Sequence, residues 1–119
     1  MKDVSPAATY AALLPDVVKA GRDCGYAIAP HGSLARDFDL IAVPWTDEAA
    51  SAQELIMRIL SVTGATFREG SRQLEGGEWE RTHGDIPSRK PHGRLAWSLH
   101  LGHSNLYLDV SVMPRASTG

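Results

Sequence analysis

The sequence predicts an α/β (α+β) fold, with a small mixed β-sheet of about four or five strands and two main helices on one face. Three patterns predict it: apolar residues recur at helical spacing in 52–64, run almost continuously through 38–43, and alternate with polar residues in 95–112. With 119 residues, the chain has the length of one ordinary domain. We therefore expect one hydrophobic core and a single domain over 1–119.

Composition limits the classes of function. The apolar fraction of 43% and charged fraction of 22% are typical of a globular protein, and the formal net charge of −2 argues against a protein that coats nucleic acid. The single cysteine, Cys24, has no partner for a disulfide or a zinc site. No apolar run is long enough to cross a bilayer, and Asp3, Pro6 and Pro15 interrupt the segment where a signal peptide needs an apolar core. We expect a cytoplasmic protein, of a bacterium or a phage-infected host, that does not associate with membranes.

The N-terminal segment predicts the first helix. Ser5 followed by Pro6 fits an N-cap and a first-turn proline, so a helix should begin here. Pro15 should restart or kink this helix. It should end near Gly25, since glycine favours the residue after a helix.

The middle of the chain predicts two strands and the second helix. Residues 26–29 are a brief strand candidate, and the nearly continuous apolar run at 38–43 is typical of a strand covered on both faces. Ser51 and Glu54 have the spacing of a capping box, and the apolar pattern that follows continues to Gly64. These signals predict a helix that begins after Ser51 and ends at Gly64.

The last half of the chain predicts a hairpin preceded by an irregular stretch. Residues 66–68 are a third strand candidate, whereas 69–91 are rich in Gly, Pro, Arg and Glu and indicate a long loop or excursion. Residues 95–101 and 106–112 alternate in the manner of a β-hairpin. Residues 115–119 are expected to form a frayed tail.

The stretch "HGSLARDFDLIAVPW", at 31–45, carries two aspartates at the start of the most apolar strand. Asp37 and Asp39 share one strand face while Phe38 points to the other. Two neighbouring carboxylates repel each other unless a cation or a proton lies between them, and hard cations such as Mg²⁺ prefer carboxylate oxygens. The pair is therefore either a metal site or an acidic strand end without a ligand.

Asp109 strengthens the metal interpretation. It lies within the apolar segment "LYLDVSVM", where an unpaired charge is costly. If Leu101 pairs with Leu106 across the hairpin turn, the register sets Ser98 opposite Asp109. If the hairpin lies beside the 38–43 strand, three carboxylates converge on a site for Mg²⁺ or Mn²⁺.

A basic segment, "SRKPHGR", leads into the final hairpin. Arg89, Lys90 and Arg94 in this segment are candidates to bind phosphate or a nucleic-acid backbone, and the alternative is a solvated loop. The three tryptophans are expected to pack inside the fold rather than to stack on bases; they are Trp45, Trp79 and Trp97.

These residues together resemble a known family. Gly32–Ser33, then "DFDL" running into a strand, then an acidic residue in a later strand, resembles the DNA polymerase beta-like nucleotidyltransferase superfamily. In that family a Gly–Ser pair opens a short helix whose backbone binds phosphate, an Asp-x-Asp pair holds the metal ions, and a third carboxylate completes the site. The resemblance implies that Gly32 and Ser33 bind nucleotide phosphate, and that Asp37, Asp39 and Asp109 are catalytic residues that hold Mg²⁺ or Mn²⁺.

The resemblance implies a minimal nucleotidyltransferase-like protein, which would transfer a nucleotidyl group from a nucleoside triphosphate to an acceptor hydroxyl. Arg89, Lys90 or Arg94 would neutralise phosphate. The chain also resembles small phage and prophage proteins with an "RDxDLxxVPW" core and a "KPHGR" segment. The alternative is a non-catalytic phage-type accessory protein of the same fold that binds a nucleotide, a nucleic acid or a host protein. The short link between Ser33 and Asp37 favours that alternative.

Overall fold

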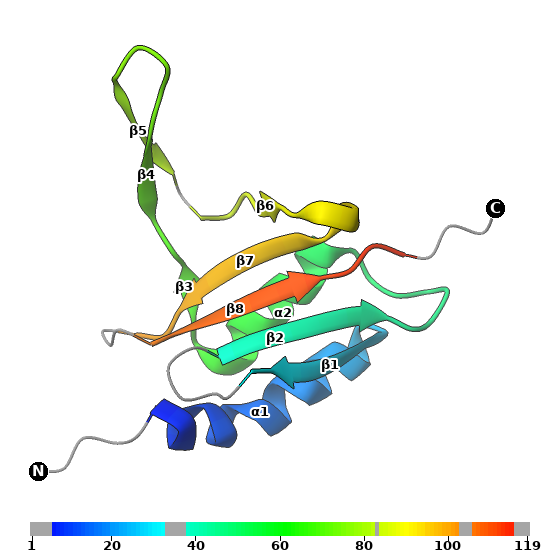
Figure 1. The fold of residues 1–119 in the computed structure, drawn as a ribbon. Coiled ribbons are helices and arrows are strands. Elements are labelled where there is room, and N and C mark those ends of the chain that lie inside the picture. Colours follow the sequence, from blue (N-terminus) through cyan, green and yellow to red (C-terminus); the bar gives the residue numbers. More distant parts are fainter. Residues whose placement is uncertain (1–5, 33–37, 83, 103–105, 116–119) are drawn as a thin grey trace, which may run out of the picture.

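The computed structural model describes residues 6–32, 38–82, 84–102 and 106–115. Two helices and a mixed sheet of six strands form the body of the molecule, and a separate two-stranded sheet projects from it (Figure 1). The elements, in chain order, are α1 (Pro6–Asp23), β1 (Tyr26–His31), β2 (Phe38–Pro44), α2 (Ala52–Thr63), β3 (Thr66–Phe67), β4 (Gly70–Gln73), β5 (Trp79–Thr82), β6 (Ser88–Arg89), the 3-10 turn η1 (Pro91–Gly93), β7 (Leu95–His100) and β8 (Tyr107–Val112). The predicted α+β fold class is confirmed, with more strands than expected.

The six-stranded sheet runs in the order β1-β2-β8-β7-β3, and β6 also pairs with β7 as part of this sheet. β2 and β8 are parallel, and the other neighbouring strands are antiparallel. The last strand of the chain is therefore inserted at the centre of the sheet, next to β2.

Helix α1 runs through Pro15, which lies inside it. The expected helix therefore forms as one element, and its predicted N-cap Ser5 lies outside the described residues. The helix ends before Gly25, whose φ of +84° is in the left-handed region that favours glycine. A Cβ at Gly25 would lie 2.5 Å from Thr46 Oγ1, so this turn also brings two backbone segments close together.

Helix α2 begins and ends where its sequence signals predict. Ser51 Oγ accepts a hydrogen bond from the backbone N–H of Glu54 at 3.2 Å, which caps the N-terminus. Gly64 adopts the left-handed conformation and its N–H donates to the carbonyl of Leu60 at 2.9 Å. The helix buries the apolar stripe formed by Leu55, Ile56 and Ile59.

The hydrophobic core lies between the two helices and one face of the six-stranded sheet (Figure 1). The core-facing residues of the central strands are Phe38, Leu40, Ala42, Trp97, Leu99, Leu108, Val110 and Val112. In β2 the intervening residues Asp39 and Ile41 are only half-buried and Val43 is exposed. The expectation that this strand is covered on both faces is therefore wrong, because both helices pack on the same side of the sheet.

Residues 69–91 contain regular structure that the sequence pattern did not indicate. β4 and β5 pair as an antiparallel hairpin, which we call the arm (residues 70–82), and it extends away from the body (Figure 1). Arg72 Nε and Glu80 Oε2, from opposite strands of the arm, form an ion pair at 2.7 Å. The segment expected to be a long loop or excursion is thus an excursion that contains paired strands, which the sequence pattern did not reveal because the described side chains of the arm are all exposed and give no alternating apolar pattern.

The chain after β8 returns toward the segment between β2 and α2. Arg115, the first residue of the expected tail, donates from its guanidinium to the backbone carbonyls of Asp47, at 3.3 Å, and Ala49. The rest of the expected tail, 116–119, lies outside the described residues.

Neither helix, as far as the chain is described, combines the length and the hydropathy that a transmembrane segment requires.

Candidate functional site

The face of the six-stranded sheet that lies opposite the helices carries a band of polar residues; we call it the open face. In β8 the residues Tyr107, Asp109 and Ser111 point to the open face, because they alternate with core residues. All three are half-buried. Since β8 lies between β2 and β7 in the sheet, Asp109 has a neighbouring strand on each side.

One neighbour of Asp109 is Asp39. The parallel pairing of β2 with β8 sets Asp39 directly opposite Asp109. Neighbouring strands lie about 4.8 Å apart, and paired residues point to the same face, so the two aspartates are neighbours on the open face. The last hairpin does lie beside the 38–43 strand, which is the condition for the carboxylates to converge, while Asp37 lies outside the described residues.

The other neighbour of Asp109 is Ser98, in β7. Ser98 Oγ donates a hydrogen bond to Asp109 Oδ1 at 2.7 Å. The predicted hairpin register is confirmed, since Ser98 pairs with Asp109 and the N–H of Leu101 donates to the carbonyl of Leu106 at 2.9 Å. The hydroxyl fixes the orientation of one side of the Asp109 carboxylate.

Asp39 has β1 on its other side. His31 is its partner in the antiparallel register and is exposed. Gly32, which follows, has a φ of +90°, and a Cβ built on it would lie 3.8 Å from Asp39 Oδ2. Gly32 thus lies close to the Asp39 carboxylate, and Ser33 lies outside the described residues.

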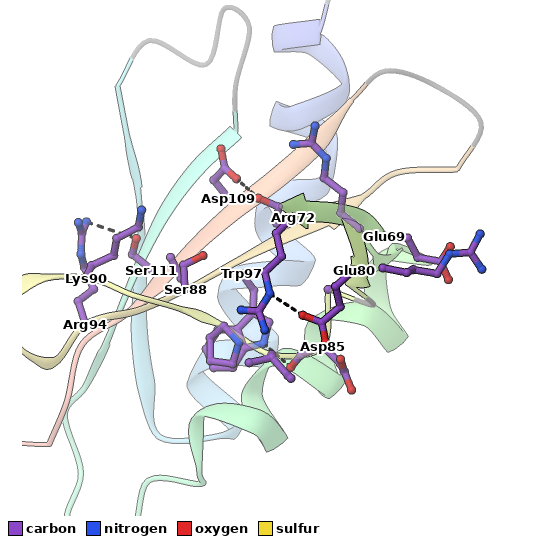
Figure 2. Close-up of a pocket in the computed structure, with 17 residues that line it drawn as sticks. Glu69, Arg72, Glu80, Asp85, Ser88, Lys90, Arg94, Trp97, Asp109 and Ser111 are labelled. Atoms are coloured by element: carbon purple, nitrogen blue, oxygen red, sulfur yellow. Dashed lines mark hydrogen bonds and ion pairs between the residues drawn. The ribbon is translucent and has the colours of Figure 1, made fainter. Parts of the chain in front are cut away.

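A trough of about 1000 Å³ lies between the arm and the open face and includes Asp109 in its lining (Figure 2). Its basic lining residues are Arg68, Arg72, Arg81, Lys90 and Arg94. The lining also includes the carboxylates of Glu69, Glu80 and Asp85, and one of these, Glu80, is paired with Arg72. The trough is thus mixed in charge, with an excess of one basic residue once Asp109 is counted.

Arg68 is a site candidate that the sequence did not reveal. Its guanidinium carbon lies 5.0 Å from the centre of the Tyr107 ring, a cation–π arrangement. Its backbone N–H donates to the carbonyl of Ser98 at 3.3 Å, which places Arg68 alongside the strand that supports Asp109. No local pattern marks Arg68, because its position depends on pairing with a strand about thirty residues later in the chain.

Two of the three predicted phosphate-binding cations reach the trough. Lys90 and Arg94 line it, and Arg94 Nη1 donates to Ser111 Oγ at 3.4 Å (Figure 2). Arg89 pairs with Leu95, whose parity in β7 is that of the core-facing residues, so its side chain points away from the open face. Arg89 is therefore not part of the trough that Lys90 and Arg94 line.

The tryptophans differ in environment. Trp97 is 2% exposed and its indole N–H donates to the carbonyl of Asp85 at 3.1 Å. Trp45 is 65% exposed and Trp79 is 67% exposed. The prediction that all three pack inside the fold is right for Trp97 and wrong for the other two, since Trp45 follows the end of β2 and Trp79 belongs to the arm.

The carboxylate pair offers hard oxygen ligands of the kind that Mg²⁺ prefers. Within the described part of the chain, no group of three or more His, Cys, Asp or Glu side chains is placed to hold a metal ion. The structure thus brings together two of the three predicted metal ligands, Asp39 and Asp109, and the third, Asp37, is outside the described residues.

Comparison of the chain with models of protein families, with curated proteins and with solved structures finds no match. The geometry of the open face is therefore the basis for a functional proposal.

Proposed function

We propose that the chain is a minimal nucleotidyltransferase-like protein, which transfers a nucleotidyl group from a nucleoside triphosphate to an acceptor hydroxyl with Mg²⁺ or Mn²⁺. The observation that carries this proposal is the register of Asp39 and Asp109 on neighbouring parallel strands. Two carboxyl groups held side by side on a half-buried surface favour a divalent cation between them. This is also the pairing that the resemblance to the nucleotidyltransferase superfamily implies.

The carboxylate side chains at this site are suitable ligands for such an ion. Asp39 and Asp109 would hold it, with Asp37 as the third ligand, and Ser98 keeps the Asp109 carboxylate oriented through its hydrogen bond. The bound ion would neutralise phosphate charge and make the acceptor hydroxyl more acidic. Lys90, Arg94 and Arg68, which line the same trough, would offset the remaining charge of the triphosphate.

On the other side of the carboxylate pair, Gly32 and Ser33 would bind phosphate of the nucleotide. Gly32 lies close to Asp39 and carries no side chain, so a phosphate can approach the backbone there. This arrangement favours phosphate binding by the segment that follows β1.

One observation favours a second function. Large apolar side chains are exposed on the arm and the segment after it, and they are Leu74, Trp79 and Ile86. Exposed apolar groups on a projecting element are typical of surfaces that bind other proteins. The alternative function is that of a non-catalytic accessory protein of the same fold, whose open face binds a nucleotide or nucleic acid and whose arm contacts a host protein.

The two functions are separated by ligand-dependent stability and by turnover. Thermal denaturation with Mg²⁺ or Mn²⁺ and each nucleoside triphosphate should show stabilisation in the wild type that is lost in Asp37→Asn, Asp39→Asn and Asp109→Asn. Asp85→Asn is the matched control, because Asp85 lines the trough outside the carboxylate pair. Transfer of label from an α-³²P nucleoside triphosphate to a hydroxyl acceptor would then establish catalysis.

Failure of every metal and nucleotide to change the melting curve would exclude the transferase proposal. Stabilisation by nucleotide without any transfer, and without dependence on Asp39, would favour the accessory-protein function.

A further inference from the structure

We propose that Ser88, Lys90, Arg94 and Ser111 form a metal-independent site for the terminal phosphates of a nucleoside triphosphate. The identity of the ligand rests on the proposed function, whereas the existence of an anion site at this end of the trough rests on the geometry alone.

The backbone holds the two cations together. The N–H of Lys90 donates to the carbonyl of Arg94 at 2.8 Å across the turn η1. Within this turn His92 adopts a φ of 67°, unusual for a residue other than glycine, and Gly93 a φ of 76°. A Cβ at Gly93 would lie 3.2 Å from Pro114 Cγ, so the turn is also packed against the end of the chain that follows β8. The backbones of Lys90 and Arg94 are therefore held next to each other, and both side chains line the trough.

No counter-charge from the described part of the chain is paired with these cations. The ion pairs found there are Lys19–Asp23 and Arg72–Glu80. Figure 2 shows Lys90 and Arg94 at one end of the trough, while Glu69, Glu80 and Asp85 lie toward the other. Two like charges held close together repel each other, and a bound anion removes that cost.

Two hydroxyl groups and a small floor residue complete the site. The strand registers pair Ser88 with Ala96, and Ala96 with Ser111, so the three residues form a row on the open face. Ala96 leaves space between the two serine hydroxyls because its side chain is a single methyl group. Arg94 Nη1 donates to Ser111 Oγ at 3.4 Å, and a guanidinium has five N–H donors, so Arg94 retains donors for an anion.

The position of the site relative to the carboxylate pair indicates a polyphosphate. Ser111 follows Asp109 by two residues on the same face of β8, a separation of about 7 Å. One triphosphate can therefore extend from the carboxylate pair to Lys90 and Arg94. A nucleic-acid backbone fits less well, because the chain has a net charge of −2 and the trough contains interspersed carboxylates.

The test is calorimetric titration of the full chain with pyrophosphate, at low ionic strength and with EDTA to remove divalent cations. We expect wild-type binding to weaken about tenfold or more in Arg94→Gln and in Lys90→Gln, since each change removes a charge-assisted hydrogen bond. Arg89→Gln is the matched control, because it removes the same charge from the adjacent residue on the opposite face, and its affinity should stay within about twofold of wild type. ATP should compete with pyrophosphate in the wild type.

Ala96→Leu should prevent pyrophosphate binding without altering any charge, because the larger side chain would fill the space between the two serine hydroxyls. This variant tests the site even if Arg94→Gln does not fold. Absence of wild-type binding, or equal losses in Arg89→Gln and Arg94→Gln, would overturn the site. Arg94-dependent binding of a single-stranded oligonucleotide without pyrophosphate binding would overturn the assignment of the ligand. Pyrophosphate binding that persists in Asp39→Asn would support the site even if no nucleotidyl transfer is found, so the two proposals fail separately.

Discussion

Asp39 and Asp109 lie directly opposite each other on the two parallel central strands, β2 and β8. Parallel neighbours require a crossover, and here the chain forms α2, β3, the arm and β7 before β8 returns beside β2. The carboxylate pair is thus produced by the topology of the sheet and not by a local motif. Without a bound cation, repulsion between these two carboxylates should lower the free energy of unfolding, and this effect can be measured.

Asp109→Asn is expected to stabilise the protein without metal. The amide removes the charge that faces Asp39 but keeps an oxygen to accept the hydrogen bond from Ser98. Relief of a like-charge cross-strand pair is worth about 0.5 kcal/mol in the free energy of unfolding. Urea denaturation in EDTA measures this change, with Asp85→Asn as the control, and a loss of stability in Asp109→Asn would contradict the repulsion.

Ser98→Ala is expected to destabilise the protein more than Ser111→Ala. Ser98 Oγ lies 2.7 Å from Asp109 Oδ1, whereas Ser111 Oγ accepts from Arg94 at 3.4 Å. Loss of the shorter bond costs about 1 kcal/mol in the free energy of unfolding, and the longer bond contributes less. Both serines are on the open face of the same strand pair, so chemical denaturation of the two variants is a matched comparison. Equal losses in the free energy of unfolding would show that the hydrogen bond from Ser98 stabilises the protein no more than the one made by Ser111.

The elements that the sequence predicted correctly have local signals. Ser51 and Gly64 mark the two ends of α2, and the alternation around Ser98 and Asp109 fixed the register of the last hairpin. Each signal acts between residues that are close in the chain or that pair across one turn. The predicted pairing of Ser98 with Asp109 required only this local register.

The features that the sequence did not predict depend on long-range packing. β2 was expected to be covered on both faces, but the described chain supplies no layer over Val43, because both helices lie on the other side. The arm pairs polar residues such as Arg72 and Glu80, which carry no hydrophobic periodicity. Arg68 reaches the site through contacts with residues far along the chain, which are its backbone hydrogen bond to Ser98 and its cation–π contact with Tyr107. The site could therefore be predicted for its carboxylates but not for all of the cations that surround them.

Two left-handed glycines should differ in their sensitivity to substitution. Gly25 and Gly64 have similar φ values of +84° and +74°, but a Cβ would lie 2.5 Å from Thr46 Oγ1 at Gly25 and would meet no atom within 4 Å at Gly64. Gly64→Ala should therefore lower the free energy of unfolding by about 1 kcal/mol, because alanine is disfavoured at a positive φ. Gly25→Ala should lower it further, because the added Cβ would also clash with Thr46. Thermal denaturation checks the order, and equal melting temperatures would contradict the close approach at Gly25.

Tyr26 should make stability dependent on alkaline pH. Burial raises the pKa of the Tyr26 phenol above its ordinary value, with Cys24 and Glu54 adding to the effect and the Arg115 guanidinium opposing it. The phenol also donates to the carbonyl of Ala50 at 2.8 Å. Because the pKa is higher in the folded state, the unfolded chain loses this proton first as the pH rises. The stabilising contribution is therefore complete below about pH 10 and declines above it, until the folded pKa is passed.

Tyr26→Phe tests this sign directly. At pH 7 the variant should be less stable by about 1 kcal/mol, since the hydrogen bond to Ala50 is lost while the ring stays buried. Above about pH 10 its free energy of unfolding should fall less steeply than that of the wild type, because the phenyl ring has no proton to release. Urea denaturation at a series of pH values measures both slopes. Parallel slopes would show that another group is responsible for the alkaline loss of stability, whereas converging curves would assign it to Tyr26.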